Sequence, residues 1–592
     1  MSNPRMRRAF VGLTALAAAA VSAVAAAPSY ADTIASAPSG ASTVDLKLLA
    51  INDFHGNLEP PTGSGGRIQI DRNPDGTAVN VNAGGAEYLA TQLNTLRAQA
   101  ETEGVSTLTV AAGDLIGASP LLSAAFHDEP TIEALNLMGL DYASVGNHEF
   151  DEGSAELLRI QNGGCHPVDG CQDGSPYKGA KFQYLSANAF VTATEQPLLP
   201  PYAIKKVGGV KVGFIGMTLE GTKQIVSQQG VAGLDFADEA DTANRYAREL
   251  RAQGVETIIV LLHEGGAQSG PNAWQINGCN NFSGPIVDIV NRMDDSIDAV
   301  VTGHTHQAYN CEIDGRPVTS ASSFGRLVTD IDLKIDRNTG DVLTATADNT
   351  IVKRDVAKDT AQTDLIARYR RALGPVASQV VGQTTEAITR TQESLLGKCP
   401  DAGSVCGESA LGNLIADAQL AATDNEQGAV AAFMNPGGVR ADLDAGPVTY
   451  EEAFTVQPFA NNLTTLDLTG AQLYCMLEQQ FAVGRTLYPS STVGYVFDPA
   501  GTTAPLGTPC AGTRVMRGSL TIGGTAVLDS ASYRITVNNF LAGGGDGFSV
   551  LTGGKNSITG MIDLDAFTAY LGANSPVSAP ALDRIRTTVE VG

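Results

Sequence analysis

The sequence is poor in positive charge. It contains 38 Lys and Arg against 63 Asp and Glu, which gives a formal net charge of −25 over 592 residues. This balance disfavours a broad electrostatic grip on nucleic-acid duplexes or anionic membranes, while a local basic pocket for one small anion stays open. Charged residues make up only 17% and hydrophobic residues 43% of the chain, which excludes disorder for most of it.

Long apolar runs are absent after the first residues of the chain. Three arginines within the first eight residues precede an apolar run over residues 9–27. Residues 29–31 fit a signal-peptidase site of the small-x-small type. Residues 1–31 are therefore predicted to be an export signal, and a membrane anchor is the alternative. Because no apolar run follows later, we expect a secreted, extracellular protein without a membrane anchor.

Cys-x-x-Cys and His-Glu-x-x-His motifs are also missing. Their absence disfavours a thiolate zinc site and a metalloprotease. The eight cysteines are typical of an exported protein, and we interpret them as structural disulfide bonds. Connectivity stays open from sequence alone. Pairing of neighbours would give Cys165/Cys171, Cys279/Cys311, Cys399/Cys406 and Cys475/Cys510.

The chain divides into two halves of different pattern. Between residues 44 and 345, short β-branched apolar segments alternate with helical ones, which predicts an α/β layered domain. Residues 355–375 contain an amphipathic stretch that opens on Asp359, and this predicts a linker helix. Residues 379–592 are richer in short strands and turns, so we expect a separate α+β domain there.

Histidine is absent after residue 306, although the chain has seven of them. His127 and His166 have no strand context and are interpreted as surface or loop residues. Each short motif alone is weak, but a series of five at successive strand ends is hard to ascribe to chance. Because ligands bind beyond the carboxyl ends of strands in open α/β sheets, we expect one shared rim. Its polar side chains are Asp53, His55, Asp114, Asn147, His148, His263, His304 and His306.

The donors in this set are imidazole, carboxylate and one amide oxygen. This mixture, which lacks thiolate, suits a borderline divalent ion such as zinc or manganese. The donors are too many for one tetrahedral shell, so two ions are predicted, with Asp114 as a candidate bridge. Such a pair can hold a hydroxide and clamp a phosphoryl group.

These motifs, in this order, resemble those of the calcineurin-like metallophosphoesterases. The second half resembles the exported 5′-nucleotidase family, which includes 2′,3′-cyclic-nucleotide phosphodiesterases and UDP-sugar hydrolases. The resemblance covers about residues 44–575. It implies a four-layer metallophosphoesterase β-sandwich flanked by helices, a linker helix, and a separate α+β nucleoside-binding domain.

The resemblance also implies roles for the rim residues. One ion would be held by Asp53, His55, Asp114 and His306, and the other by Asp114, Asn147, His263 and His304. The catalytic histidine would be His148, with Asp151 orienting it. A helix cap is the alternative for Asp151.

In the second half, the family's Asn-x-Gly-Gly-x-Arg turn is matched at residues 435–440. The guanidinium group of Arg440 could donate hydrogen bonds to a phosphate or carboxylate oxygen. Phe459 and Phe540 match the phenylalanines that sandwich the base in the family. The alternative for Phe459 is a place in the apolar core. The alternative for the glycine-rich residues 543–547 is a tight turn without a role in binding. The further substrate-binding candidates are Asn435, Asn461 and Asp546.

One departure concerns the family's arginines before the Gly-Asn-Leu-Ile helix. Val405 and Gly407 occupy those places, and Lys398 or Arg390 are the candidate substitutes. We predict a secreted dinuclear hydrolase that removes phosphate from nucleoside 5′-monophosphates by attack of a metal-activated hydroxide. The alternatives are a 2′,3′-cyclic-nucleotide phosphodiesterase or UDP-sugar hydrolase on the same site, and a catalytically inactive extracellular binding protein. The oligomeric state stays open.

Overall fold

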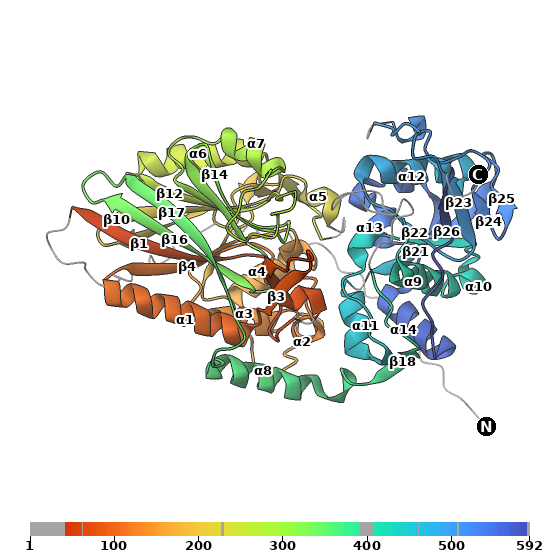
Figure 1. Ribbon diagram of the computed structural model, residues 1–592, viewed down its shortest axis with the longest axis horizontal. Coiled ribbons are helices and arrows are strands. Elements are labelled where there is room, and N and C mark those ends of the chain that lie inside the picture. The colour runs from red at the N-terminus through yellow and green to blue at the C-terminus, as the bar shows by residue number, and fades with distance from the viewer. Residues whose placement is uncertain are drawn as a thin grey trace, which may run out of the picture.

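The computed structural model describes residues 42–61, 63–226, 230–390, 407–459, 461–505 and 508–588. The predicted export signal and the Cys399/Cys406 pair lie outside these residues. Figure 1 shows two units side by side, with the long helix α8 (Thr360–Leu373) running beneath the first toward the second. In the described part of the chain, no helix has both the length and the apolarity that a membrane span requires.

Two six-stranded sheets form the centre of the first unit. The first sheet has the order β17 (Val342–Ile351), β16 (Leu327–Asp336), β1 (Thr43–Ile51), β4 (Ser106–Ala112), β5 (Tyr142–Ser144) and β6 (Gln183–Leu185). The second has the order β14 (Ala308–Ile313), β15 (Arg316–Ala321), β13 (Ala299–Thr302), β12 (Thr257–His263), β10 (Val210–Thr218) and β9 (Tyr202–Val207). The run β1-β4-β5-β6 and the run β10-β12-β13-β15 are parallel.

Helices cover the outer faces of both sheets, and an apolar layer fills the space between them. Buried side chains such as Val110, Phe214 and Leu261 form this inner layer. Helices α1 (Ala86–Glu103), α3 (Glu129–Met138) and α4 (Ser154–Asn162) pack on the first sheet. Helices α6 (Glu239–Ala252) and α7 (Pro285–Asn291) pack on the second. The predicted four-layer sandwich is confirmed.

The local sequence explains these elements. All seven residues of β12 are buried, and its unbroken run of Ile, Val and Leu is typical of a parallel strand covered on both faces. Helix α6 begins after Asp238, whose side chain accepts the Asp241 N–H at 2.8 Å. The shorter elements of this unit are β2 (Arg67–Arg72), β3 (Ala78–Asn82), β7 (Ala189–Val191), β8 (Gln196–Pro197), β11 (Leu234–Phe236), α2 (Leu121–Ala124) and α5 (Thr222–Ile225).

Helix α8 packs against α1 and α3 of the first unit. Its predicted cap is present, because the Asp359 side chain accepts the Gln362 N–H at 3.1 Å. Near its end, Arg370 pairs with Glu59 of the first unit and with Glu451 of the second, the latter at 2.9 Å. The helix thus belongs to the first core and also contacts the second unit.

The second unit is a mixed α+β structure around a five-stranded sheet. This sheet has the order β22 (Tyr488–Pro489), β19 (Ala431–Met434), β26 (Ser532–Asn538), β21 (Asn462–Thr469) and β27 (Lys555–Ile562). The smaller sheets contain β25 (Thr525–Ala526), β24 (Thr521–Ile522), β23 (Val493–Phe497) and β28 (Ile585–Thr587), and β18 (Val380–Thr384) with β20 (Gly446–Thr449). The helices are α9 (Ala410–Ala421), α10 (Asp424–Gln427), α11 (Tyr450–Val456), α12 (Gly470–Val483), α13 (Asn539–Ala542) and α14 (Asp563–Asn574).

Disulfides in the described residues follow the pairing of neighbours along the chain. They join Cys165 to Cys171, Cys279 to Cys311 and Cys475 to Cys510.

Candidate active site

The loops that follow five parallel strands bring the predicted rim together. Residues after β1, β4, β5 and β13 and the last residue of β12 contribute to it. Within each group, one ligand atom per side chain lies within 4.8 Å of the others. The three groups are Asp53/His55/His306, His55/Asp114/His148 and Asp114/His263/His304.

Asp114, a member of the last group, also lies close to His55 of the first group. On one side, the His55 Nε2 atom lies 3.1 Å from His306 Nε2 and 3.6 Å from Asp114 Oδ2. On the other side, His263 Nε2 lies 3.0 Å from the same Asp114 oxygen. Asn147 joins this side, because its Oδ1 atom lies 3.0 Å from His304 Nδ1. One carboxylate therefore stands between two sets of donors.

The backbone at the rim is strained. Five of the seven predicted ligand residues have positive φ, a region that non-glycine residues seldom adopt and that clusters at functional sites. The φ angles are 48° at Asp53, 46° at His55, 48° at Asp114, 70° at His304 and 57° at His306. Glycine is required beside them, since a Cβ on Gly146 would lie 2.2 Å from Asp114 Oδ1.

Hydrogen bonds on the outer side of the rim orient the imidazoles. His55 and His263 each place Nδ1 2.8 Å from a backbone oxygen, of Gly117 and Ala112 respectively. An Nδ1–H that donates there leaves the Nε2 lone pair facing inward, which is the usual arrangement of a metal-binding histidine. His263 Nε2 is buried and has no hydrogen-bond partner among the described residues. An orphaned buried nitrogen beside a carboxylate fits a divalent cation.

The buried rim combines neutral and charged groups. Burial opposes a charged His263 imidazole, but Asp114 outweighs burial and raises the pKa of His263 to about 10. Burial lowers the pKa of His55 and of His304 to about 3, so both present neutral imidazoles. Burial raises the pKa of Asp53 to about 7. Burial opposes ionisation of Asp114 as well, but His263 and His148 hold its pKa well below the usual value.

Two residues that support the rim were missed by the sequence reasoning. The buried Glu149 carboxylate accepts the N–H groups of Asp114, Leu115 and Gly146 at 3.0, 2.8 and 2.5 Å. Asn52 donates to Asp53 Oδ2 at 2.6 Å. Their only signal in the sequence is position, because each stands next to a predicted site residue.

His148 and Asp151 form a hydrogen-bonded pair at the same rim. The His148 Nδ1 atom lies 2.7 Å from Asp151 Oδ2, and the His148 backbone N–H donates to Asp114 Oδ1 at 2.9 Å. Burial works against a charged imidazole, but Asp151 and Asp114 outweigh it and raise the pKa of His148.

The rim opens into a cleft of about 1300 Å³ that both units line. All the predicted substrate-binding residues lie on the lining of this cleft. They are Asn435, Arg440, Phe459, Asn461, Phe540 and Asp546. Arg390, one candidate substitute for the missing arginines, also lines it. Lys398, the other candidate, and Val405 lie outside the described residues.

Two predicted nucleoside contacts are bound to each other. Asn435 Nδ2 donates to Asp546 Oδ2 at 2.9 Å, and Asn538 donates to Asn435 Oδ1 at 3.0 Å. Asp546 also pairs with Arg485, a cleft residue that the sequence reasoning did not single out. Asp546 has a φ of 55°, so the Gly-rich segment is a strained turn that aims a carboxylate at this network.

The predicted base platform contacts the catalytic candidate. The ring of Phe459 is stacked on the imidazole of His148, with centroids 5.7 Å apart. The Arg440 guanidinium lies 5.7 Å from the centroid of the same ring. The ring of Phe540 packs closely over Gly545, where a Cβ would lie 2.6 Å away.

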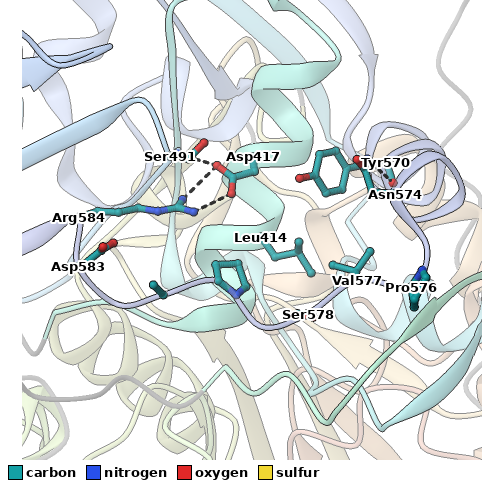
Figure 2. Close-up of a pocket in the computed structure, with 12 residues that line it drawn as sticks. Leu414, Asp417, Ser491, Tyr570, Asn574, Pro576, Val577, Ser578, Asp583 and Arg584 are labelled. Carbon is teal, nitrogen blue, oxygen red and sulfur yellow. Dashed lines mark hydrogen bonds and ion pairs between the residues drawn. The ribbon is translucent and has the colours of Figure 1, made fainter.

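A smaller cavity of about 420 Å³ lies within the second unit (Figure 2). Arg584, the one cation on its described lining, is buried and pairs with both oxygens of Asp417 at 3.1 and 2.7 Å. Arg584 also donates to the carbonyls of Asn413 and Pro489 at 3.2 and 2.7 Å. Because Asp417 already neutralises the Arg584 cation, this cavity is not assigned to an anionic substrate.

Two family models and several solved structures match this chain. Residues 46–308 match the family described as calcineurin-like phosphoesterase, and residues 380–553 match the 5′-nucleotidase, C-terminal domain. The crystal structure of a 5′-nucleotidase precursor from Thermus thermophilus superposes with a TM-score of 0.70 at 25% identity, covering 92% of this chain and 99% of that one.

Two curated relatives are longer than this chain. Endonuclease YhcR of Bacillus subtilis is 32% identical over 548 residues, which cover 92% of this chain and 41% of that protein. Cell wall protein Lmo0130 of Listeria monocytogenes is 31% identical over 553 residues, which cover 89% of this chain and 66% of that protein. The chain thus spans less than two thirds of either relative.

The fold and the family match are those of the metallophosphoesterase class, and the rim offers groups of side chains that could hold metal ions. With both matches in this order, the chain belongs to the 5′-nucleotidase family that carries an N-terminal calcineurin-like metallophosphoesterase domain.

Proposed function

We propose that the protein is a secreted 5′-nucleotidase that removes the phosphate of nucleoside 5′-monophosphates. One observation carries the proposal: the two donor groups that share Asp114 open into the same cleft as Arg440 and Phe459. A nucleotide substrate needs three features in one cleft. These are ligands for the metal ions, a positive side chain for the phosphate and an aromatic ring that stacks on the base.

Two divalent ions, zinc or manganese, would be held by the rim. Asp53, His55, Asp114 and His306 would hold one; Asp114, Asn147, His263 and His304 would hold the other. When bound, such a pair lowers the pKa of water and neutralises charge on the phosphoryl oxygens. The neutral state of His55 and the orphaned Nε2 of His263 support this assignment.

His148 is proposed as the group that handles a proton or steadies a phosphoryl oxygen during the reaction. Its Nδ1 atom faces Asp151 at 2.7 Å, which leaves Nε2 for the substrate. The raised pKa of His148 favours a protonated ring that can donate to an anionic oxygen. Asp151 would fix the orientation of that ring.

Arg440 and Arg390 are proposed to hold the phosphate. Both line the cleft, and Arg390 Nη1 donates to the carbonyl of Val439, the residue before Arg440, at 3.4 Å. Burial and then the charge of Arg390 lower the pKa of Arg440. Phe459 and Phe540 would stack on the base. Asn435, Asn461 and Asp546 would contact the nucleoside through hydrogen bonds.

Export is proposed from the sequence of residues 1–31 and from the disulfides of the described residues. Disulfides persist in oxidising compartments such as the cell exterior. The similarity to a protein named for the cell wall agrees with this location.

A second candidate is favoured by one observation. Val405 and Gly407 stand where the family carries arginines, so the grip on a phosphate monoester would be weaker. That departure leaves room for a 2′,3′-cyclic nucleotide, a UDP-sugar or another phosphoester as the substrate. The endonuclease among the relatives makes a DNA oligonucleotide a useful comparison.

The experiment is a substrate panel. Purified protein is stripped with a chelator, reloaded with Zn²⁺ or Mn²⁺, and assayed with AMP, 2′,3′-cyclic AMP, UDP-glucose and a DNA oligonucleotide. We expect activity only after reloading and the highest kcat/KM for AMP. A higher kcat/KM for another ester would replace the proposed substrate, and full activity in verified metal-free protein would overturn the metal assignment.

A further inference from the structure

A second cluster of metal-binding side chain types lies in the first unit, outside the candidate active site. It consists of His127, His166, Asp169 and Glu152. His127 stands in the turn between α2 and α3, whereas His166 and Asp169 lie in a loop closed by the Cys165–Cys171 disulfide. The two histidines, which the sequence predicted to be surface or loop residues, are thus in contact with each other.

The distances suit coordination of one cation. The Oδ2 atom of Asp169 lies 2.9 Å from His127 Nε2 and 3.2 Å from His166 Nδ1. In a tetrahedral zinc site with bonds of roughly 2.0–2.1 Å, neighbouring ligand atoms are about 3.3 Å apart. The two distances from Asp169 are close to this value, and the ligand atoms of the two histidines lie within 4.8 Å of each other.

Hydrogen bonds fix the orientation of both imidazoles in the cluster. Glu152 Oε2 lies 2.8 Å from His127 Nδ1 and Asp169 Oδ2 lies 2.9 Å from His127 Nε2, so without an ion both ring nitrogens donate to carboxylates, and a cation would replace the Nε2 proton. The Asp169 backbone N–H donates to His166 Nδ1 at 3.1 Å, so this nitrogen is unprotonated, and a cation would take its lone pair in place of that N–H. A carboxylate behind a histidine is the arrangement that orients metal-binding imidazoles.

The surrounding backbone holds the cluster in place. His127 and Asp128 have φ angles of 50° and 59°, and the buried Asp128 carboxylate accepts Gly117 N–H at 3.0 Å and Ser123 Oγ–H at 2.5 Å. In the disulfide loop, His166 and Gly170 exchange backbone hydrogen bonds of 3.2 and 2.9 Å.

The two imidazoles are stacked, with centroids 3.7 Å apart and planes at 18°. Both rings turn one nitrogen toward the same Asp169 oxygen. A tilt of the His166 ring, with loss of the Nε2 proton of His127, would direct one nitrogen of each ring at one ion. Two imidazoles and one carboxylate, without thiolate, form a borderline donor set that prefers zinc and similar cations.

We propose that His127, His166 and Asp169 form a further divalent-cation site of the zinc class, in which Glu152 orients His127. An ion there would fasten the disulfide loop to the turn before α3 and to the segment after Asp151. The site is independent of which phosphoester the cleft accepts.

The test is the zinc content of the full chain. Chelator-stripped protein is reloaded with excess Zn²⁺, desalted and analysed by mass spectrometry for zinc per chain. Relative to the wild type, we expect His166→Asn to retain about one zinc ion fewer. Val168→Thr is the matched control, because Val168 is 85% exposed in the same loop and has no ligand atom; it should retain the wild-type content.

Two further variants keep the proposal falsifiable. Should His166→Asn not fold, Asp169→Asn replaces it, since the Asp169 side chain is 44% exposed. Glu152→Gln should weaken zinc binding at this site by about 10- to 100-fold. Zinc content equal to the wild type in a folded His166→Asn or Asp169→Asn protein would overturn the proposal. This holds whether or not the protein hydrolyses AMP, so the two proposals fail separately.

Discussion

The imidazole of His148 lies nearly parallel to the phenyl ring of Phe459, with the planes at 14° and the centroids 5.7 Å apart. His148 follows β5 of the first unit, and Phe459 follows α11 of the second. The proposed proton-handling group and the proposed base platform are therefore in direct contact across the two units. Any change at Phe459 removes a neighbour of His148 as well as a stacking surface.

The first prediction separates these two effects. Phe540→Ala should raise KM for AMP by about 5- to 150-fold, because stacking on a base is worth about 1–3 kcal/mol. It should leave the kinetics with ribose 5-phosphate, which has no base, unchanged. Phe459→Ala should raise KM for AMP similarly and also lower kcat with both substrates, since His148 loses its neighbour. An unchanged KM for AMP in Phe540→Ala would remove the stacking role.

The convergence of the rim could be predicted because it depends on topology. Asp53, Asp114, His148 and His304 each follow a short apolar strand, and parallel strands end at one edge of a sheet. The apolar segments were long and β-branched enough to identify as strands, so the rim followed from them. Helix α8 and its Asp359 cap were recognisable for a similar reason, since amphipathic period and cap agree.

The remaining contacts could not be predicted, because they join segments whose sequences carry no shared pattern. Glu149 reads as an ordinary acidic residue until its three backbone partners are seen. His127 and His166 are 39 residues apart in number, yet a disulfide loop stacks them. The Arg485 pair with Asp546 likewise depends on how a helix end and a glycine-rich turn pack.

A second prediction compares a proposed ligand with the residue that supports it. Glu149→Gln should lower kcat/KM for AMP by about 10- to 100-fold, as expected for a group that only holds ligand loops in place. Asp114→Asn should cost more than that, because Asp114 Oδ2 lies within 3.6 Å of both His55 and His263. Metal content measured on the same samples should fall further in Asp114→Asn. The reverse order of the two variants would contradict a shared bridging carboxylate.

A third prediction concerns stability and pH. Burial raises the pKa of Asp298 to about 7, and its Oδ2 accepts the Ile258 N–H at 2.8 Å. The folded protein therefore holds this proton at pH values where the unfolded chain, with a pKa of about 3.9, has lost it. Consequently the stability contributed by neutral Asp298 is complete below about pH 4 and is lost as the pH rises toward about 7.

Asp298→Asn retains an acceptor for Ile258 but cannot ionise. Relative to the wild type, this variant should gain Tm at pH 8, and the gain should shrink as the pH is lowered to 5. Calorimetry of both proteins at several pH values measures the effect. Asp295→Asn is the control, since that side chain is fully exposed and its replacement should not alter the pH profile. A Tm difference that is the same at every pH would show that Asp298 is not a buried titrating group.

The last prediction tests the proposed phosphate grip. Arg440 lines the cleft, and its Nη1 atom donates to the Gly437 carbonyl at a long 3.5 Å. Burial lowers the pKa of Arg440, whereas Asp114, Asp151 and Asp53 favour its charged form. Hydrogen bonds to charged groups contribute about 1.5–3 kcal/mol, so Arg440→Ala should raise KM for AMP by about 10- to 150-fold. The KM of Arg440→Lys for AMP should lie between those of the wild type and Arg440→Ala, because lysine keeps the positive charge but cannot donate two parallel hydrogen bonds. Inorganic phosphate should inhibit both variants less than the wild type. Arg517→Ala, at an exposed arginine of the second unit, is the control and should leave the KM for AMP and the inhibition by phosphate unchanged. If Arg440→Ala showed the same KM and the same inhibition as this control, the phosphate would be held elsewhere.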